Sequence, residues 1–398
     1  MTIGGSTAAA QLAILAPWSD PAPVIGAGER SDRLARARAA TAASGAAALL
    51  VTAGASLRYF TGVGWSPTER LVALLLPVAG EPIVICPAFE RGSLVAELEI
   101  AADIRLWEED ADPVALVVDA LPAGATLALD PLLPFAVARR LGATLTVTDG
   151  AGIIDGLRMI KSPAELALMA QAKAMTLEVH RRTARILAPG IRASEVKRFI
   201  DDAHRALGAP GYTFCAVQFG TATAFPHGLP GDQALADDQL VLVDTGCAIH
   251  GYQSDITRTY AFGRVDDDIR ATWALEKEAQ AAAFAAVRPG VPCEAVDAAA
   301  RAVLERAGLG PDYRLPGLPH RTGHGIGLSI HEPAYLVRGD TTPLAPGMCF
   351  SNEPMIVVPE RYGIRLEDHF HVTEDGAAWF TEPQPSIDRP FDPESLTP

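Results

Sequence analysis

Acidic residues interrupt apolar, strand-like segments in the second half of the chain, in an order that suits metal binding. Asp244 directly follows the apolar residues 241–243, and Asp255 lies across a short turn that contains Gly251. Cross-strand neighbours of a hairpin face the same side of a sheet, so both carboxylates can reach one face. A carboxylate directly after three apolar strand residues is poorly placed for solvation by water.

A second pair of acids has the same setting about one hundred residues later. Glu353 follows the segment 348–352, and Glu367 follows the segment 363–366. The glycine-rich segment 320–327, which contains His324, lies between the two pairs. Each predicted hairpin therefore contributes two acids, and the segment between them contributes one imidazole.

Four buried carboxylates cannot all ionise without compensation, because removing each charge from water costs about several kcal/mol. Two divalent cations would balance four negative charges, and His324 would complete the ligand set. Oxygen-rich coordination with one histidine favours Mn²⁺, Co²⁺, Fe²⁺ or Zn²⁺ over metals that select thiolates. The alternative is that the acids cap turns and pair at the surface with Arg258, Arg321 and Arg365.

The elements that must position these residues also occur twice. Helices are predicted over 163–187, after the capping box Ser162-Pro163-Ala164-Glu165, and over 193–207, after Pro189-Gly190. Helices over 267–287 and 293–307 flank Pro289-Gly290 in the same way. Each helix pair precedes one acidic hairpin, so the pattern predicts a duplicated helix–helix–hairpin unit whose halves face each other. Chance similarity of two Pro-Gly helix ends is the alternative.

The first 150 residues contain no catalytic spacing, but they alternate between helical and strand-like patterns. Helices are predicted over 30–44 and 116–121, and strands over 46–51, 71–78, 83–86 and 126–130. Such alternation is typical of a small α/β domain with a covered sheet. We therefore expect an N-terminal domain over 1–155 and a catalytic domain over 156–398.

Composition limits the classes of function. The 398 residues carry a net charge of −15, which disfavours nucleic acid or an anionic membrane as the main partner. No apolar run reaches the ~20 residues of a membrane helix, and residues 1–17 lack the features of a secretory signal. The five cysteines form no C-x-x-C pair, which argues against a disulfide framework or zinc knuckle. We expect a soluble, cytoplasmic protein.

The acids and His324 together resemble the ligand set of the pita-bread metallopeptidase family, which includes methionine aminopeptidases, Xaa-Pro aminopeptidases and Xaa-Pro dipeptidases (prolidases). The steps of eleven and fourteen residues within the acid pairs suit the prolidase pattern. Residues 153–376 resemble the catalytic domain, and the preceding residues, with Tyr59-Phe60-Thr61-Gly62, resemble the creatinase/prolidase N-terminal domain. The resemblance implies an α/β N-terminal domain and an α+β pita-bread catalytic domain with an internal pseudo-two-fold duplication.

The resemblance also implies roles for the five residues. Asp244 would bind one of two divalent ions, most simply Mn²⁺, and His324 with Glu353 would bind the other. Asp255 and Glu367 would bridge the two ions. A metal-bridging hydroxide would then attack the peptide carbonyl, and Glu353 would carry the proton to the leaving nitrogen.

Further residues match positions that contact substrate in related enzymes. His227 and His331 match the histidine pair beside the scissile peptide, where they would orient or protonate the prolyl nitrogen. The alternative for His227 is a solvated turn residue. Arg365 lies where the family often has an arginine that supports the metal carboxylates.

Xaa-Pro dipeptidase is the activity that the resemblance favours, with a homodimer as the expected assembly. A dipeptidase must bind the free carboxylate of its substrate, usually through an arginine. Archaeal-type prolidases have that arginine at the position of Tyr335, and the next arginine here is Arg338. Arg338 either reaches the carboxylate or lies in an exposed loop.

Four other activities stay open. The first two are an Xaa-Pro aminopeptidase that acts on longer peptides and a metal-dependent hydrolase of a non-peptide small molecule. The third is metal-free cleavage of C–N bonds, and the fourth is partner binding without catalysis.

Overall fold

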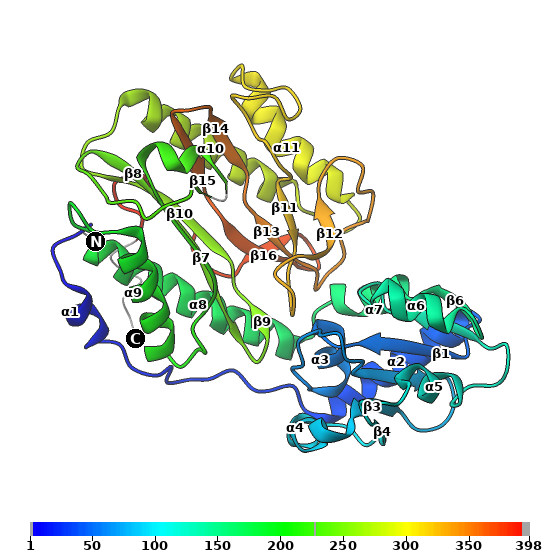
Figure 1. Cartoon of the computed structure of the whole chain (residues 1–398). Coiled ribbons are helices and arrows are strands. Elements are labelled where there is room, and N and C mark those ends of the chain that lie inside the picture. The colour runs from blue at the N-terminus through cyan, green and yellow to red at the C-terminus, as the bar shows by residue number, and fades with distance from the viewer. Residues whose placement is uncertain (1–2, 227, 392–398) are drawn as a thin grey trace. The chain divides into compact units, whose positions relative to one another are not determined.

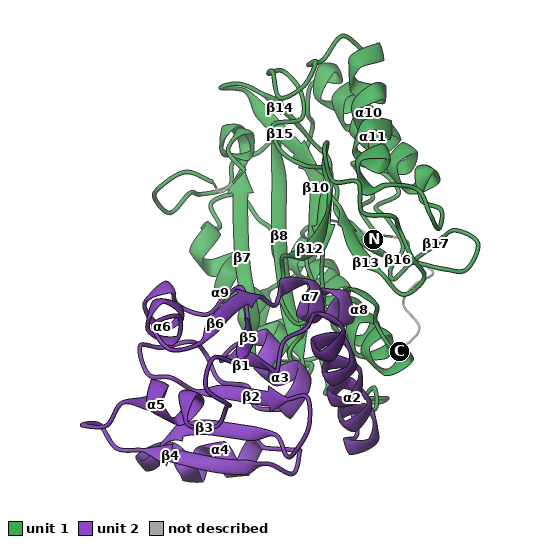
Figure 2. Ribbon diagram, turned by 90° about the vertical axis from the view of Figure 1, so that its right-hand side faces the viewer, with its two compact units in different colours: residues 1–23, 159–398 green, residues 24–158 purple. Residues whose placement is uncertain are grey.

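The computed structural model describes residues 3–226 and 228–391. The chain divides into two compact units, shown in Figure 2. Unit 2 comprises Val24–Arg158, and unit 1 comprises Met1–Pro23 together with Met159–Pro398. Unit 1 resumes at Met159, three residues after the predicted start of the catalytic domain at residue 156.

Unit 2 is a mixed α/β domain. Its six-stranded sheet has the order β4-β3-β2-β1-β5-β6, with antiparallel pairing of β1–β2 and β2–β3 and parallel pairing elsewhere. The elements in chain order are α2 (Ala27–Ala43), β1 (Ala48–Thr52), α3 (Ala55–Thr61), β2 (Ala73–Pro77), β3 (Ile83–Pro87), η1 (Ala88–Glu90), α4 (Arg91–Glu97), β4 (Asp103–Trp107), α5 (Pro113–Val118), β5 (Thr126–Leu129), α6 (Phe135–Leu141), β6 (Thr146–Asp149) and α7 (Ala151–Met159).

The central strands of this sheet match the predicted apolar runs, whereas the two outer strands were not predicted. Every residue of β1 and β3 is buried, so these strands read as continuous apolar sequence. β4 and β6 lie at the sheet edges, and all four residues of β6 are exposed. An edge strand with exposed faces has no apolar run or alternation by which its sequence could be recognised.

Unit 1 carries the acidic residues. Its elements are α1 (Ala8–Leu12), α8 (Pro163–Ile186), α9 (Ala193–Ala206), β7 (Tyr212–Phe219), η2 (Gly220–Ala224), β8 (Gln239–Ile249), β9 (Tyr252–Gln253), β10 (Ile256–Phe262), α10 (Asp267–Ala286), α11 (Cys293–Arg306), β11 (Gly323–Gly325), β12 (Glu332–Leu336), β13 (Cys349–Asn352), β14 (Met355–Val358), β15 (Tyr362–Arg365), β16 (Asp368–Val372) and β17 (Ala377–Trp379). The four long helices agree with the predicted ranges to within one residue at each end. The predicted capping box of α8 is present, with Ser162 Oγ accepting from the amide of Glu165 at 3.2 Å.

Unit 1 contains a pair of helices followed by antiparallel strands twice, as the sequence predicted. The pair α8–α9 covers the antiparallel strands β7, β8 and β10, and the pair α10–α11 packs on the strands of the second half (Figure 1). The second half forms the sheet β12-β11-β13-β16-β17 and the ribbon β14–β15. Apolar side chains of α10 and α11, including Ala283 and Val296, fill the core against β13, β14 and β16.

The first residues of the chain belong to unit 1, whereas the predicted N-terminal domain, 1–155, included them. The amide of Gly4 donates to Ala184 O at 2.7 Å, and the amide of Trp18 donates to Leu207 O at 3.0 Å. The amide of Ala22 donates to Gln171 Oε1 at 2.7 Å. Long-range backbone contacts of this kind leave no trace in local sequence patterns. In the described part of the chain, no helix is both long and apolar enough to cross a bilayer.

Candidate metal centre

Strands β8 and β10 bring the two aspartates together. Asp244 pairs with Thr257, and the next pair along the ladder is Thr245 with Ile256. Asp255 immediately precedes β10, so it lies one step further along the strand, on the diagonal from Asp244. The predicted cross-strand arrangement of the two carboxylates is therefore present, because side chains two residues apart on one strand share a face.

The two glutamates lie at a gap between two ladders. Strands β13 and β16 end with the pair Asn352–Asp368, and strands β14 and β15 begin with the pair Met355–Arg365. The same register, continued through the gap, sets Glu353 opposite Glu367. Because regular pairing stops here, both carboxylates are adjacent at one interruption of the sheet.

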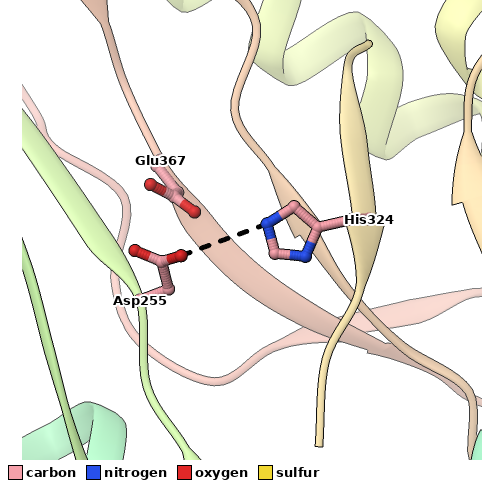
Figure 3. Close-up of side chains that lie close together, drawn as sticks. All are labelled: Asp255, His324 and Glu367. Atoms are coloured by element: carbon pink, nitrogen blue, oxygen red, sulfur yellow. Dashed lines mark ion pairs between the residues drawn. The ribbon is translucent and has the colours of Figure 1, made fainter. Parts of the chain in front are cut away.

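His324 on β11 completes the group. Its Nδ1 lies 3.0 Å from the carbonyl oxygen of Gly325, which can only accept, so Nδ1 carries the hydrogen. Nε2 lies 3.1 Å from Glu353 Oε1 and 4.0 Å from Asp255 Oδ2. Figure 3 shows Asp255, His324 and Glu367 directed toward one another from three separate segments, and their ligand atoms all lie within 4.8 Å of one another.

Three of these five residues are buried, and Asp244 and Glu353 are partly buried, with side chains 14% and 15% exposed. The side chains of His324, Glu367 and Asp255 are 1%, 2% and 8% exposed. Within the described residues, Asp244 Oδ1, Asp255 Oδ1 and Glu367 Oε1 are buried without a hydrogen-bond partner. Unpaired buried carboxylate oxygens are costly, so they call for an explanation such as a bound cation.

The titration of the acids follows from this crowding. Burial and the charge of Glu367 raise the pKa of Asp255 well above its usual value, and burial and the charge of Glu353 do the same for Glu367. Burial alone would raise the pKa of Glu353, but the hydrogen bond and charge of His324 outweigh it and lower that pKa to about 2. Like charges thus resist ionisation of the cluster until a cation compensates them.

Among the described residues, one arginine pairs with a carboxylate of this group. Arg365 donates from Nη2 to Asp244 Oδ2 and from Nε to Thr257 Oγ1, the latter at 3.0 Å. Burial by itself would lower the pKa of Arg365. The charges of Asp244 and the other acids outweigh this effect, so the pKa of Arg365 is raised. Arg258 pairs instead with Asp368 at 2.6 Å. The alternative of surface ion pairs with three arginines does not describe this buried group.

The donor set therefore fits divalent cations. Carboxylate oxygens without partners surround the Nε2 atom of His324, and such a set of oxygen and nitrogen donors around one space favours a bound cation. Hydrogen bonding of the other ring nitrogen to a carbonyl is the usual support of a metal-binding histidine. All five predicted ligand positions are brought together.

A cavity of about 430 Å³ opens beside the centre, lined by Pro226, Pro319, His320, Arg321, His331, Glu353 and Arg365. The exposed His331 holds its ring edge-on to His324, with 4.2 Å between the ring centroids. Glu353, whose side chain is 15% exposed, is the ligand candidate that faces this space. His227 lies outside the described residues.

Two of the predicted substrate residues lie elsewhere. Arg338 donates to Asp312 Oδ1 at 2.7 Å and lines a different cavity, along α11. Tyr335 does not line the cavity beside the centre, but its ring lies 4.5 Å from the guanidinium carbon of Arg321. Arg321 itself was considered only as a possible surface partner of an acid. Its place three residues before His324 was the available signal for a role in the site.

Comparison with known proteins gives two family matches that together cover most of the chain. Residues 167–374 match the model of metallopeptidase family M24, and residues 33–160 match the creatinase/prolidase N-terminal domain.

Curated relatives and solved structures agree with these matches. The probable dipeptidase PepE of Mycobacterium tuberculosis is 41% identical over 355 residues, covering 87% of this chain and 92% of that protein. The Xaa-Pro dipeptidase of Lactobacillus helveticus is 32% identical over 344 residues, covering 82% and 90%. The crystal structure of dipeptidase PepE from Mycobacterium ulcerans has a TM-score of 0.83 at 38% identity, covering 90% of this chain and 97% of that one. A prolidase from Thermococcus sibiricus has a TM-score of 0.81 at 28% identity, covering 88% and 96%.

Proposed function

Because the chain belongs to metallopeptidase family M24 and carries a creatinase/prolidase N-terminal domain, we propose that it hydrolyses Xaa-Pro dipeptides at a dinuclear metal centre. The family and the fold class predicted from the acid pairs and His324 are thereby confirmed. The observation that carries the proposal is the buried group of four carboxylates and one imidazole with unpartnered oxygens. The relatives named dipeptidase, prolidase and Xaa-Pro dipeptidase support the substrate class.

Five residues would hold the two ions. Asp244 would bind one, His324 and Glu353 the other, and Asp255 and Glu367 would bind both. Mn²⁺ is our first choice, with Co²⁺, Zn²⁺ and Fe²⁺ as alternatives, because oxygen ligands dominate the set. When bound, the two cations would supply a hydroxide near neutral pH and polarise the scissile carbonyl.

We assign the transfer of the proton to Glu353. It belongs to the buried group and also lines the cavity, so it contacts both the centre and the space for substrate. We propose that it accepts the proton of the attacking water and delivers it to the leaving nitrogen.

His331 serves the leaving group. A prolyl nitrogen in a peptide bond carries no hydrogen, so it needs a donor or an orienting contact when the bond breaks. His331 lines the same cavity as Glu353, and its ring is held against His324. His227 retains the same proposed role on the strength of the sequence.

A substrate comparison tests the proposal. Purified protein supplied with Mn²⁺ should hydrolyse Ala-Pro and Gly-Pro, and should act poorly on Ala-Pro-Ala and Ala-Ala. Cleavage of the tripeptide without the dipeptides would instead indicate an aminopeptidase. Binding of the metal with no hydrolysis of any peptide would point to a non-peptide substrate.

Substitution of a bridging residue tests the centre independently. Asp255→Ala and Glu367→Ala should each abolish both metal binding and hydrolysis, as measured by elemental analysis and a proline-release assay. Full activity in either variant would contradict the site. A wild-type protein that binds no transition metal and is not activated by Mn²⁺ or Co²⁺ would contradict the metal-dependent reaction altogether.

The expected homodimer stays a prediction. Sedimentation velocity of the purified protein would test it, and a monomer at micromolar concentration would contradict it.

A further inference from the structure

Two guanidinium groups, of Arg321 and Arg365, line the cavity beside the carboxylate group. They differ in what they already bind. Arg365 is buried, donates to Asp244 and Thr257, and is surrounded by the negative charge of the centre. Its charge is thus committed to the protein's own carboxylates, which leaves it poorly suited to bind another anion.

Arg321 has no such commitment. Across the described residues, neither a hydrogen bond nor an ion pair engages its guanidinium. The residue is half-buried, and its guanidinium carbon lies 4.5 Å from the ring centroid of Tyr335. A guanidinium stacked on an aromatic face keeps all of its N–H groups available in its own plane for a planar anion. Tyr335 therefore holds the guanidinium of Arg321 in place, while none of the described acidic side chains pairs with it.

The other arginine considered for substrate binding is occupied. Arg338 is exposed, pairs with Asp312 at 2.7 Å and lies near the ring of Tyr313. It lines a cavity along α11 that contains neither His331 nor Glu353. Its position therefore gives it no access to the space beside the centre within this unit.

Resting on the dipeptidase function proposed above, we infer that Arg321 binds the C-terminal carboxylate of the dipeptide and that Tyr335 positions it. In an Xaa-Pro dipeptide, only the prolyl nitrogen and one α-carbon separate the scissile carbonyl from that carboxylate. Both ends must therefore be bound within one small cavity, and Glu353 and Arg321 line the same one. A planar carboxylate can accept two parallel hydrogen bonds from a guanidinium.

Tyr335 explains how the cation is supplied. The prolidase pattern described above has an arginine at this position of the chain. Here the residue at 335 is a tyrosine directly opposite His324 in the β11–β12 ladder, and its ring supports the guanidinium of Arg321 from the neighbouring strand. Arg321, two residues before β11, supplies the cation, and the ring of Tyr335 keeps it in place.

This assignment has a consequence for substrate length. A tripeptide has an uncharged amide where a dipeptide has its terminal carboxylate, so it cannot form an ion pair with Arg321. A guanidinium binds a carboxylate more strongly than a neutral amide, because both partners are then charged, and a loss of about 10- to 100-fold in kcat/KM is expected for the tripeptide. Arg321 would thus determine the preference for dipeptides.

The experiment compares Ala-Pro with its amide, Ala-Pro-NH₂, which differs only in the charge of the terminal group. The ratio of kcat/KM for the acid to that for the amide is measured with Mn²⁺-loaded wild type and variants. Both substrates are assayed on the same preparation, so the ratio does not depend on the fraction of correctly folded enzyme. In the wild type the acid should be favoured by about 10- to 100-fold.

In Arg321→Ala the ratio should fall to near one, through loss of activity on the acid alone, and Arg321→Lys should restore part of it. Tyr335→Leu should lower the ratio, whereas Tyr335→Phe, which keeps the ring, should not. Arg338→Ala is the matched control and should keep the wild-type ratio.

Two outcomes would overturn the inference, and they are distinguishable. A wild-type ratio retained in Arg321→Ala would refute the role of Arg321 while leaving the dipeptidase function intact. A wild-type enzyme that cleaves neither substrate would refute the dipeptidase function and, with it, the inference.

Discussion

Replacing Glu367 by glutamine should stabilise the metal-free protein while destroying its response to metal. Glu367 is 2% exposed, and burial and neighbouring acids raise its pKa. The substitution removes one negative charge but keeps the size of the side chain. Thr257 Oγ1, which donates to Glu367 Oε2 at 2.8 Å, can still donate to the amide oxygen. The new amide group can donate toward the carboxylates that Glu367 now repels.

The distances set the magnitude. Two unit charges 4.8 Å apart, the outer limit for the ligand atoms of Asp255 and Glu367, repel by about 3.5 kcal/mol at an effective dielectric constant of about 20. Partial protonation of the cluster already relieves some of this repulsion, so we expect a net gain of about 1–3 kcal/mol. That gain corresponds to a rise of roughly 1–4 °C in the melting temperature of the metal-free protein, since the unfolding entropy grows with chain length.

Differential scanning calorimetry at pH 8, with and without Mn²⁺, measures both effects. Metal at about 100 times its dissociation constant should stabilise the wild type by about 2.7 kcal/mol per site, and Glu367→Gln should lose most of this gain. Glu374→Gln, an exposed acid on the same segment, is the matched control and should match the wild type in both states. A metal-free Glu367→Gln protein that melts below the wild type, or one that keeps the full response to Mn²⁺, would refute the reasoning.

Other changes have equally definite outcomes. His331→Ala should lower kcat on Ala-Pro by about 10²-fold or more with unchanged metal content by elemental analysis, and loss of metal would contradict its role at the leaving group. The pKa values of Asp255 and Glu367 are raised in the folded metal-free protein. Above about pH 4 the folded protein therefore binds more protons than the unfolded chain, and the free energy of unfolding falls as pH rises from there. The rise in melting temperature on adding Mn²⁺ should therefore be larger at pH 8 than at pH 5.5, and an equal or smaller rise at pH 8 would contradict the crowding of charges. Lys161→Met should lower the free energy of unfolding in urea by about 3–5 kcal/mol, because Glu332 would stay buried without its cation. Lys161 Nζ lies 2.6 Å from Glu332 Oε1. A change below about 1 kcal/mol would show that the pair contributes little.

The local features of the protein could be predicted from the sequence. The four long helices of unit 1 could be predicted to within a residue because caps, Pro-Gly ends and helical periodicity are properties of contiguous residues. The same holds for the positions of the acids, since a carboxylate after an apolar run stands out against its neighbours. The duplicated order of elements then suggested that the two acid pairs converge, and the structure brings Asp244, Asp255, Glu353 and Glu367 together with His324.

Tertiary structure alone decided the arrangement around those acids. The gap between two ladders that sets Glu353 opposite Glu367 depends on strand register, which is fixed by pairing between distant segments. The same is true of the edge strands β4 and β6 and of residues 3–23, whose partners lie far away in the chain. The sequence alone does not distinguish the roles of Arg321 and Arg338. The fold places Arg321 beside the carboxylates and pairs Arg338 with Asp312. Side-chain type is a local property, but the charge that a side chain faces depends on what the rest of the chain brings to it.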